Sequence, residues 1–369
     1  SVRAPRYYDF QSRLLYKPAE DNLLDILFFL SDDQFRFLGK DAEGNETTVS
    51  SFGTRFKKVR VKWKRSLSSR WLAETVLVSG PATQDFIFNG SSNSYDTTLE
   101  LNLREERTRP ITPESMFGWK YGIDVYSGQF RFDYNIPSFP GDPEIGEYLF
   151  LSPALYFENT ARLRNLELIS GIRAEGYTLE GGICVPAYDP RLSWRYSIGD
   201  FGFFKGGIGR FSQFPTPRQL SPDADGNPKL KAQQSTQLSL GYEQAVFSSV
   251  RLELTGYYNQ LNDLVVGRED RFRFFTGPPP IGPFDTEPYA NASTGRIYGL
   301  ETQIRYNGPN TIALIAATFS RSERINRAGE LRLFTYDQPF VINALLSQQL
   351  PKNWRLGSRL RYSAGNPYT

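Results

Sequence analysis

The sequence predicts an all-β protein, a transmembrane antiparallel up-and-down β-barrel, and three observations lead to this prediction. Apolar and polar residues alternate with a period of two through most of the chain. The alternating segments are joined by connections that are short and long in turn. The tryptophans gather beside the short connections. Together these features predict about sixteen strands in one barrel domain that spans residues 1–369.

The alternation separates apolar from charged side chains along individual segments. Residues 59–64 place Val, Val and Trp on one face and Arg, Lys and Lys on the other. Residues 117–126 and 250–255 repeat this pattern with other side chains. The longest apolar run, residues 23–30, contains Asp25 and is far shorter than the roughly 20 residues of a spanning helix. A barrel needs only every second residue to be apolar, so the mean hydropathy of -0.45 is compatible with a membrane protein.

The connections between strands alternate in length, which places all the long ones at one end of the sheet. The short ones are 17–22, 66–69, 109–114, 160–165, 199–202, 245–248, 307–310 and 350–353. The long ones are 32–54, 79–94, 137–147, 177–189, 212–232, 262–289 and 321–338. Outer-membrane barrels have this plan, whereas a β-sandwich has no reason to adopt it.

The tryptophans predict which end of the strands meets a membrane interface. All five lie within about five residues of a short connection, and at least four share the apolar face of their strand. They are Trp63, Trp71, Trp119, Trp194 and Trp354. The alternative is a soluble all-β protein, but its core would scatter tryptophan along the strands. We therefore expect these residues to form an aromatic girdle at the membrane interface.

The other face of the strands is strongly charged and is expected to line the interior. The charged residues predicted to face the lumen or a plug are Lys58, Arg60, Lys62, Lys64, Arg173, Arg251, Glu253 and Glu301. Eight strands would enclose packed side chains, whereas about sixteen with inward charge imply a lumen that holds water or a folded plug. The row from Lys58 to Lys64 either guides anions or, as we favour, pairs with acidic plug residues.

Composition excludes several classes of site. The chain has no His, one Cys (Cys184) and one Met, so a Ser-His-Asp triad, a zinc site and a disulfide framework are excluded within it. We expect neither an enzyme nor a cofactor. The 43 basic and 40 acidic residues show no basic excess for nucleic acid. Residues 41–45 and 223–227 start like calcium loops but lack the closing Glu, so no metal site is predicted.

Several short motifs follow one another along the whole chain. They are residues 6–11 (RYYDFQ), 171–173 (GIR), 189–192 (DPRL), 226–230 (GNPKL), 240–243 (LGYE), 299–301 (GLE), 337–339 (DQP) and 365–369 (GNPYT). In this order and spacing they resemble the barrel of TonB-dependent outer-membrane receptors from residue 5 to 369. One departure is Phe340, where the family often has His.

The resemblance implies a twenty-two-stranded barrel in the bacterial outer membrane, with about two strands missing before this sequence and four after it. It also implies an N-terminal plug domain and TonB as partners, neither of which the sequence shows. The barrel would meet outer-membrane lipid and lipopolysaccharide and, in some cases, a surface lipoprotein or other complex subunits. The implied function is import of a scarce large solute, of siderophore, vitamin or oligomer type. Two alternatives stay open, a structural, assembly or export component of a surface complex and a passive porin-like channel.

One long connection carries a candidate for ligand binding. Arg271, Phe272, Arg273 and Phe274 combine cations and aromatic rings just before the proline-rich residues 277–280. Such side chains suit an anionic aromatic chelate. The alternative is that this loop packs on its neighbours or meets lipopolysaccharide phosphates.

Overall fold

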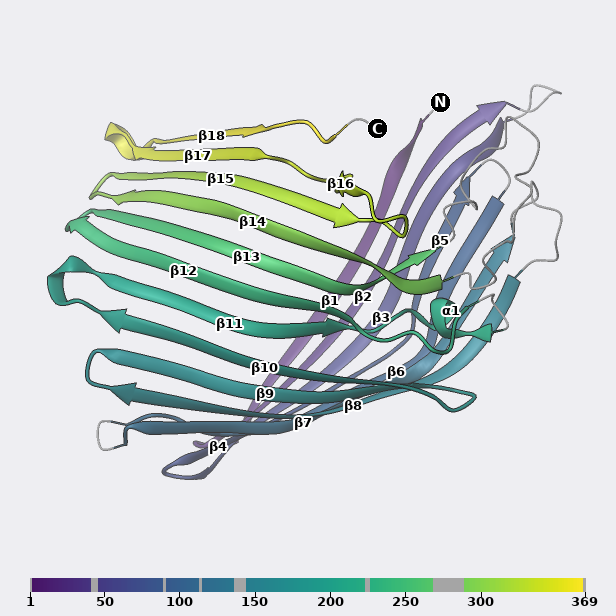
Figure 1. Cartoon of the computed structure of the whole chain (residues 1–369), viewed down its shortest axis with the longest axis horizontal. Coiled ribbons are helices and arrows are strands. Elements are labelled where there is room, and N and C mark those ends of the chain that lie inside the picture. The colour runs from purple at the N-terminus through teal and green to yellow at the C-terminus, as the bar shows by residue number, and fades with distance from the viewer. Residues whose placement is uncertain are drawn as a thin grey trace.

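A computed structural model of the chain describes residues 2–40, 46–88, 91–112, 115–135, 144–222, 226–267 and 289–367. One antiparallel sheet of eighteen strands curves into a wide arc (Figure 1). The strands are β1 Val2–Ala19, β2 Asn22–Lys40, β3 Glu46–Ser68, β4 Trp71–Ser79, β5 Ala82–Phe88, β6 Ser91–Arg109, β7 Phe117–Asn135, β8 Glu144–Leu163, β9 Leu166–Leu179, β10 Ile183–Ser197, β11 Phe203–Gln213, β12 Gln233–Phe247, β13 Val250–Gly267, β14 Tyr289–Asn307, β15 Thr311–Ile325, β16 Leu331–Leu333, β17 Phe340–Gln349 and β18 Arg355–Ser363. The short helical segments are α1 Pro217–Leu220, η1 Gly199–Phe201 and η4 Pro351–Asn353.

The sheet is a meander in which the eighteen segments occupy sixteen positions. β4 and β5 both lie between β3 and β6, and β16 and β17 both pair with β15, so 18 − 2 = 16. This agrees with the predicted number of strands. Gly80 causes the break between β4 and β5, because its φ of 141° and a virtual Cβ only 1.9 Å from the Lys57 carbonyl oxygen admit glycine alone. In the part of the chain that the structure describes, no ladder joins β1 to β18, so these two strands are the edges of the sheet.

The turns confirm that the predicted short connections lie at one end of the sheet, but several connections predicted to be long are shorter, since strands extend into 32–54 and 79–94. Every predicted short connection joins consecutive strands at the same end of the sheet. The connection predicted to be long at 177–189 is instead a tight hairpin, because β9 continues to Leu179 and β10 starts at Ile183. Gly181 and Gly182, with φ values of 91° and 85°, make the turn. Many strands are also longer than predicted, up to the 23 residues of β3, because pairing continues into the regions expected to be loops.

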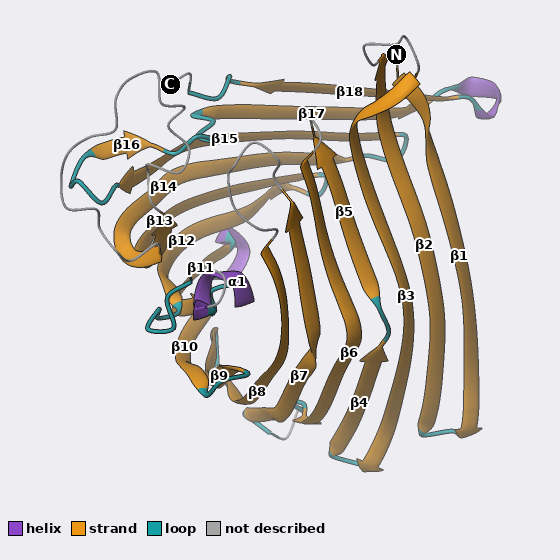
Figure 2. Ribbon diagram, turned by 90° about the vertical axis from the view of Figure 1, so that its right-hand side faces the viewer, coloured by secondary structure: helices purple, strands orange, loops and turns teal. Residues whose placement is uncertain are grey.

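Partner residues in a ladder share one face of the sheet, so the register assigns every strand residue to the concave or the convex side. Figure 2 shows α1 inside the curve of the sheet, which identifies the concave side. Large hydrophobic side chains such as Leu14, Ile123, Leu155 and Leu240 are at least half exposed on the convex side. Among the described residues, no helix is long and apolar enough to cross a membrane.

Candidate functional site

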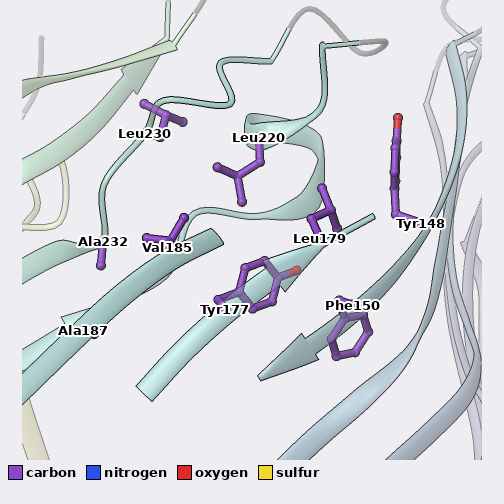
Figure 3. Packing of buried hydrophobic residues seen from close by; sticks show 9 residues of the cluster. All are labelled: Tyr148, Phe150, Tyr177, Leu179, Val185, Ala187, Leu220, Leu230 and Ala232. Atoms are coloured by element: carbon purple, nitrogen blue, oxygen red, sulfur yellow. The ribbon is translucent and has the colours of Figure 1, made fainter. Parts of the chain in front are cut away.

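The connection between β11 and β12 folds back into the concave side of the sheet. We call residues 214–232 the strap; residues 223–225 lie outside the described part of the chain. Leu220 and Ser221 in the strap are fully buried. Figure 3 shows Leu220 and Leu230 from the strap beside Tyr177, Leu179 and Val185 from the wall. The strap therefore has its own apolar contact with β8, β9 and β10 and does not hang free in the lumen.

Polar contacts hold the strap to both sides of the barrel. A capping box starts α1, in which the Thr216 hydroxyl accepts from the Gln219 amide and the Gln219 side chain accepts from the Thr216 amide. The Ser221 hydroxyl donates to the Tyr148 hydroxyl on β8. Toward β14, the side chain of Asn227 donates to the Tyr289 carbonyl at 2.9 Å. The strap thus connects strands that lie far apart in the sheet.

A second set of bonds joins the end of the strap to the hairpin of β13 and β14. The Asn291 side chain donates to the Lys231 carbonyl at 3.1 Å and accepts from the Lys231 amide at 2.8 Å. The same side chain donates to the Asp263 carbonyl at 2.6 Å. Asn291 therefore fixes the strap against the start of β14.

A pocket of about 620 Å³ lies between the strap and the opposite wall. Its lining residues are Thr54, Ala82, Thr83, Gln84, Phe130, Thr216, Pro217, Arg218, Gln219 and Tyr289. These side chains include hydroxyl, amide and aromatic groups and one guanidinium, and most of the lining surface is apolar. The size falls within the range of small-molecule sites, and the pocket opens toward the end of the sheet with the long connections.

The predicted lumen-facing cations on β3 lie on the concave face and find acidic partners on the wall itself. The pairs are Lys58 with Glu100, Arg60 with Asp25 (3.0 Å), Lys62 with Glu74 (2.8 Å) and Lys64 with Glu74 (3.6 Å). These partners lie on β2, β4 and β6, so each cation of the row has an acidic partner on the wall itself, although three carboxylates serve four cations. Contact of the row with a plug stays a prediction.

Arg173 belongs to a second charged cluster on the concave face. Asp124 is 7% exposed and accepts from Arg104 Nε at 2.6 Å and from Arg173 Nη1 at 2.6 Å. The Arg173 Nε donates at 2.7 Å to Glu175, which also accepts from the Ser152 hydroxyl at 2.9 Å. The network joins β6, β7, β8 and β9 across the inner wall.

The remaining predicted lumen residues lie on β13 and β14. Arg251 pairs with Glu243 at 3.4 Å, and Glu253 pairs with Lys205. Glu301 lines a small concave pocket of about 170 Å³ and forms no ion pair within the described part of the chain. The inner wall therefore offers both satisfied charge pairs and a carboxylate that is available to another group.

The tryptophans lie at the end with the short turns. Trp63, Trp71, Trp119 and Trp194 face the convex side, and Trp354 directly precedes β18. Packing contacts join some of them to neighbouring rings, such as Trp71 to Tyr121 at 5.9 Å. Their location in a membrane interface stays a prediction.

A second aromatic row, which we did not predict from the sequence, lies on the convex face. On β1, β10 and β14, and at the start of β18, an exposed aromatic residue near the short turn has a partner eight residues away on the same face. The pairs are Tyr16 and Tyr8, Tyr196 and Tyr188, Tyr306 and Tyr298, and Trp354 and Tyr362. Between them the outward residues are apolar or uncharged, such as Leu300, Thr302 and Ile304 on β14.

The register shows that the aromatic residues of each row lie at the same height along the axis of a barrel with tilted strands. We call a series of residues that pair with one another across successive strands a ladder row. The ladder row through Tyr8 reaches Glu147 on β8, whereas the ladder row through Tyr188 reaches Leu155 on the same strand. Tyr8 and Tyr188 are eight neighbouring-strand pairings apart, and their rows differ by eight residues. The row of Tyr298 reaches Leu192 on β10, a shift of 192 − 188 = 4 over four steps. The ladder row through Tyr362 reaches Thr302 on β14, which lies four residues from Tyr298 after three neighbouring-strand pairings.

A shift of about one residue per strand corresponds to a strand tilt of about 35°, given about 3.3 Å per residue and 4.8 Å between strands. Eight residues then separate the two aromatic rows by about 22 Å in height, close to the ~25 Å apolar band of membrane barrels. The eight-residue spacing of outward Tyr and Trp was visible in the sequence and would have located both rows.

Arginine placed midway between the rows is expected to destabilise the protein. Leu254 lies on the convex face, four residues from Tyr258. In lipid vesicles, Leu254→Arg should lower the free energy of unfolding by about 2–4 kcal/mol. Thr255→Arg is the matched control, since Thr255 faces the lumen beside Glu253 and Glu301 and should cost much less. Equal losses in urea titrations of the two variants would refute the assignment of faces.

The candidate ligand residues Arg271, Phe272, Arg273 and Phe274 lie outside the described residues. The described residues contain no group of three or more His, Cys, Asp or Glu side chains that could hold a metal ion.

A curved antiparallel meander with an apolar convex face and a charged concave face defines the class as a membrane β-barrel wall. The comparison with protein families is specific: residues 3–369 match the model described as "TonB dependent receptor-like, beta-barrel". The chain belongs to this family, whose members are outer-membrane receptors and transporters. No curated protein sequence matches the chain.

Solved structures with the same fold include one transporter and two receptors at low identity. The FrpB iron transporter of Neisseria meningitidis has 11% identity and a TM-score of 0.72, with 98% of this chain and 59% of that chain covered. The siderophore receptor PirA of Pseudomonas aeruginosa has 16% identity and a TM-score of 0.67, with 97% and 63% covered. The ferric-catecholate import receptor Fiu of E. coli has 10% identity and a TM-score of 0.69, with 97% and 64% covered. The chain thus spans less than two thirds of the length of these proteins.

Proposed function

We propose that this chain forms most of the wall of a TonB-dependent importer in the bacterial outer membrane, which takes up a scarce large solute. The observation that carries the proposal is the match of residues 3–369 to the receptor barrel family. The convex aromatic rows about 22 Å apart support the membrane location. Three solved structures of the same fold are named as an iron transporter, a siderophore receptor and a ferric-catecholate import receptor.

The concave side supports transport rather than a purely structural role. The strap and the pocket of about 620 Å³ beside it form a concave surface that is mostly apolar and carries a few polar groups. A scaffold would need no such pocket. The pocket and the loop with Arg271–Phe274 are the proposed places of first contact with solute.

We further propose that additional strands and a plug domain complete the barrel. An edge strand exposes unpaired N–H and C=O groups, which in a bilayer cost several kcal/mol each. Both β1 and β18 are such edges in the described structure. The structurally similar proteins are longer than this chain, which covers 59% and 63% of two of them, so their extra length is sufficient for further strands and a plug.

Uptake by cells that express the intact protein tests the proposal. We expect the protein to carry at least one radiolabelled solute from a panel of ferric siderophores, cobalamin and oligosaccharides. Uptake should stop when the proton gradient is collapsed or TonB is removed. Uptake that persists without the proton gradient and without TonB would indicate a passive channel. No uptake, together with a partner protein bound over the loops, would indicate a component of a surface complex. Either outcome would contradict the importer proposal.

A further inference from the structure

A cluster of charged side chains lies on the convex face of β3, β4 and β6, where most outward residues are apolar. Arg65 Nη2 donates to Glu105 at 3.0 Å and to the Thr75 hydroxyl at 2.8 Å. Arg107 Nη1 also donates to Glu105. Two guanidinium groups therefore share a single carboxylate. We call Arg65, Glu105, Arg107 and the adjacent Arg109 the girdle arginine patch.

The patch lies at the depth of the aromatic row near the short turns. The ladder row of Tyr16 passes through Trp63 and Thr75 to Glu105. Because the aromatic level moves about one residue per strand, it falls two residues beyond Trp63, at Arg65, and four residues beyond Glu105, at Arg109. Arg65 and Arg109 therefore sit at the interface level, and Glu105 lies about 11 Å deeper in the apolar band.

Charge and exposure make the patch a site for an anion. Three arginines against one glutamate give a net charge of 3 − 1 = +2. The side chains of Arg65, Arg107 and Glu105 are 20%, 29% and 33% exposed, so their edges reach the surface. Arg109 has no ion pair within the described part of the chain. Among the described residues, Glu105 is the only acidic residue that forms an ion pair with the arginines of the patch.

Aromatic rings surround the patch. The Arg65 guanidinium lies 4.0 Å from the centre of the Trp63 ring. Trp71 contacts Tyr121, which is the ladder partner of Arg107, and Trp119 is the partner of Arg109. Three of the five tryptophans thus frame this one group of arginines. Arginine and tryptophan at the end of an apolar band suit a lipid that offers a phosphate above its acyl chains.

We propose that the girdle arginine patch binds the headgroup of an anionic phospholipid, phosphatidylglycerol or cardiolipin, in the leaflet that meets the short turns. Arg65, Arg107 and Arg109 would hold the phosphate, because guanidinium groups donate paired hydrogen bonds to phosphate oxygens. Glu105 accepts from two of the arginines and competes with the phosphate for their N–H groups. The tryptophan faces would cover the glycerol and upper acyl chains. The inference rests on the membrane placement proposed above.

The test measures lipid retained by the purified intact protein. The protein is delipidated in detergent, exposed to equimolar cardiolipin and phosphatidylcholine, and analysed by native mass spectrometry. We expect the natural protein to retain cardiolipin and Arg107→Gln/Arg109→Gln to retain roughly tenfold less. Arg107→Lys/Arg109→Lys, which keeps the charge, should recover most of the binding. Arg162→Gln/Arg164→Gln, at another short turn, is the matched control and should bind as the natural protein does.

A second variant separates lipid binding from a structural ion pair. Glu105→Gln raises the net charge of the patch, so cardiolipin retention should stay equal or rise even if thermal stability falls. A patch that only stabilises the fold would show lower stability in both variants and no preference for cardiolipin over phosphatidylcholine, which would overturn the inference. If lipid preference is absent but solute uptake is intact, the lipid-binding inference is wrong and the importer proposal stands. If uptake fails but cardiolipin still binds, the lipid-binding inference stands.

Discussion

Replacement of Asp124 by alanine is expected to lower the free energy of unfolding by about 3–5 kcal/mol. Asp124 is 7% exposed and accepts from both Arg104 and Arg173 at 2.6 Å. Its removal leaves Arg104 without its only ion-pair partner in the described structure, and Arg173 keeps only Glu175. The cost falls mainly on Arg173, whose side chain is 23% exposed, because the Arg104 side chain is 50% exposed and water can hydrate it. Urea titration of the intact protein in lipid vesicles, followed by tryptophan fluorescence, measures the change.

The matched control is an exposed pair of the same chemistry. Arg6 and Asp32 join β1 to β2 at 2.9 Å, but their side chains are 47% and 33% exposed. Asp32→Ala should therefore cost less than about 1 kcal/mol, as exposed ion pairs usually do. If Asp124→Ala and Asp32→Ala cost the same, the inner network does not stabilise the wall. If Arg173→Ala restores stability to Asp124→Ala, residual repulsion between the arginines is the cause of the loss.

The sheet was predictable because its determinants are local. Alternation along residues 59–64 assigns the two faces of β3 without knowledge of any neighbour. The short turns carry their own signals, which is why the sixteen positions agree with the structure. The hairpin at Gly181 and Gly182 carried such a signal as well. A long loop is nevertheless what we predicted for 177–189, whereas Pro186 and Pro190 both lie within β10, where each proline lacks the N–H of one ladder bond.

The candidate site was less predictable because its contacts join distant parts of the chain. Nothing near Leu220 in the sequence indicates that it packs on Tyr177 and Leu179, or that Ser221 meets Tyr148. Pairing of the β3 cations with Glu74 and Glu100 depends on strand register, which alternation alone does not give. The sequence did predict that these cations face inward, but their acidic partners required the ladder.

Replacement of Leu220 by alanine is expected to release the strap from the wall. Leu220 is fully buried against β8, β9 and β10, and Leu→Ala at such positions costs about 2–5 kcal/mol. Since the strap is anchored locally, we expect this loss as local opening while the sheet stays folded. The readout is hydrogen exchange of the Gly226 and Asn227 amides, which donate to strap carbonyls at 2.7 Å in the closed form. Their exchange should accelerate at least about 25-fold, since the loss is at least about 2 kcal/mol and each 1.4 kcal/mol is a factor of ten.

Leu238→Ala is the control. Leu238 is 52% exposed on the convex face of β12, so this substitution removes the same atoms at a position that does not contact the strap. It should leave exchange at Gly226 and Asn227 unchanged. A strap that acts as a fixed wall of the pocket would lose solute affinity in Leu220→Ala and keep it in Leu238→Ala, because Thr216, Pro217 and Gln219 would no longer hold their places opposite Gln84. Equal exchange in both variants would mean that the polar bonds from Asn227 and Asn291 hold the strap, and that its apolar contact contributes little.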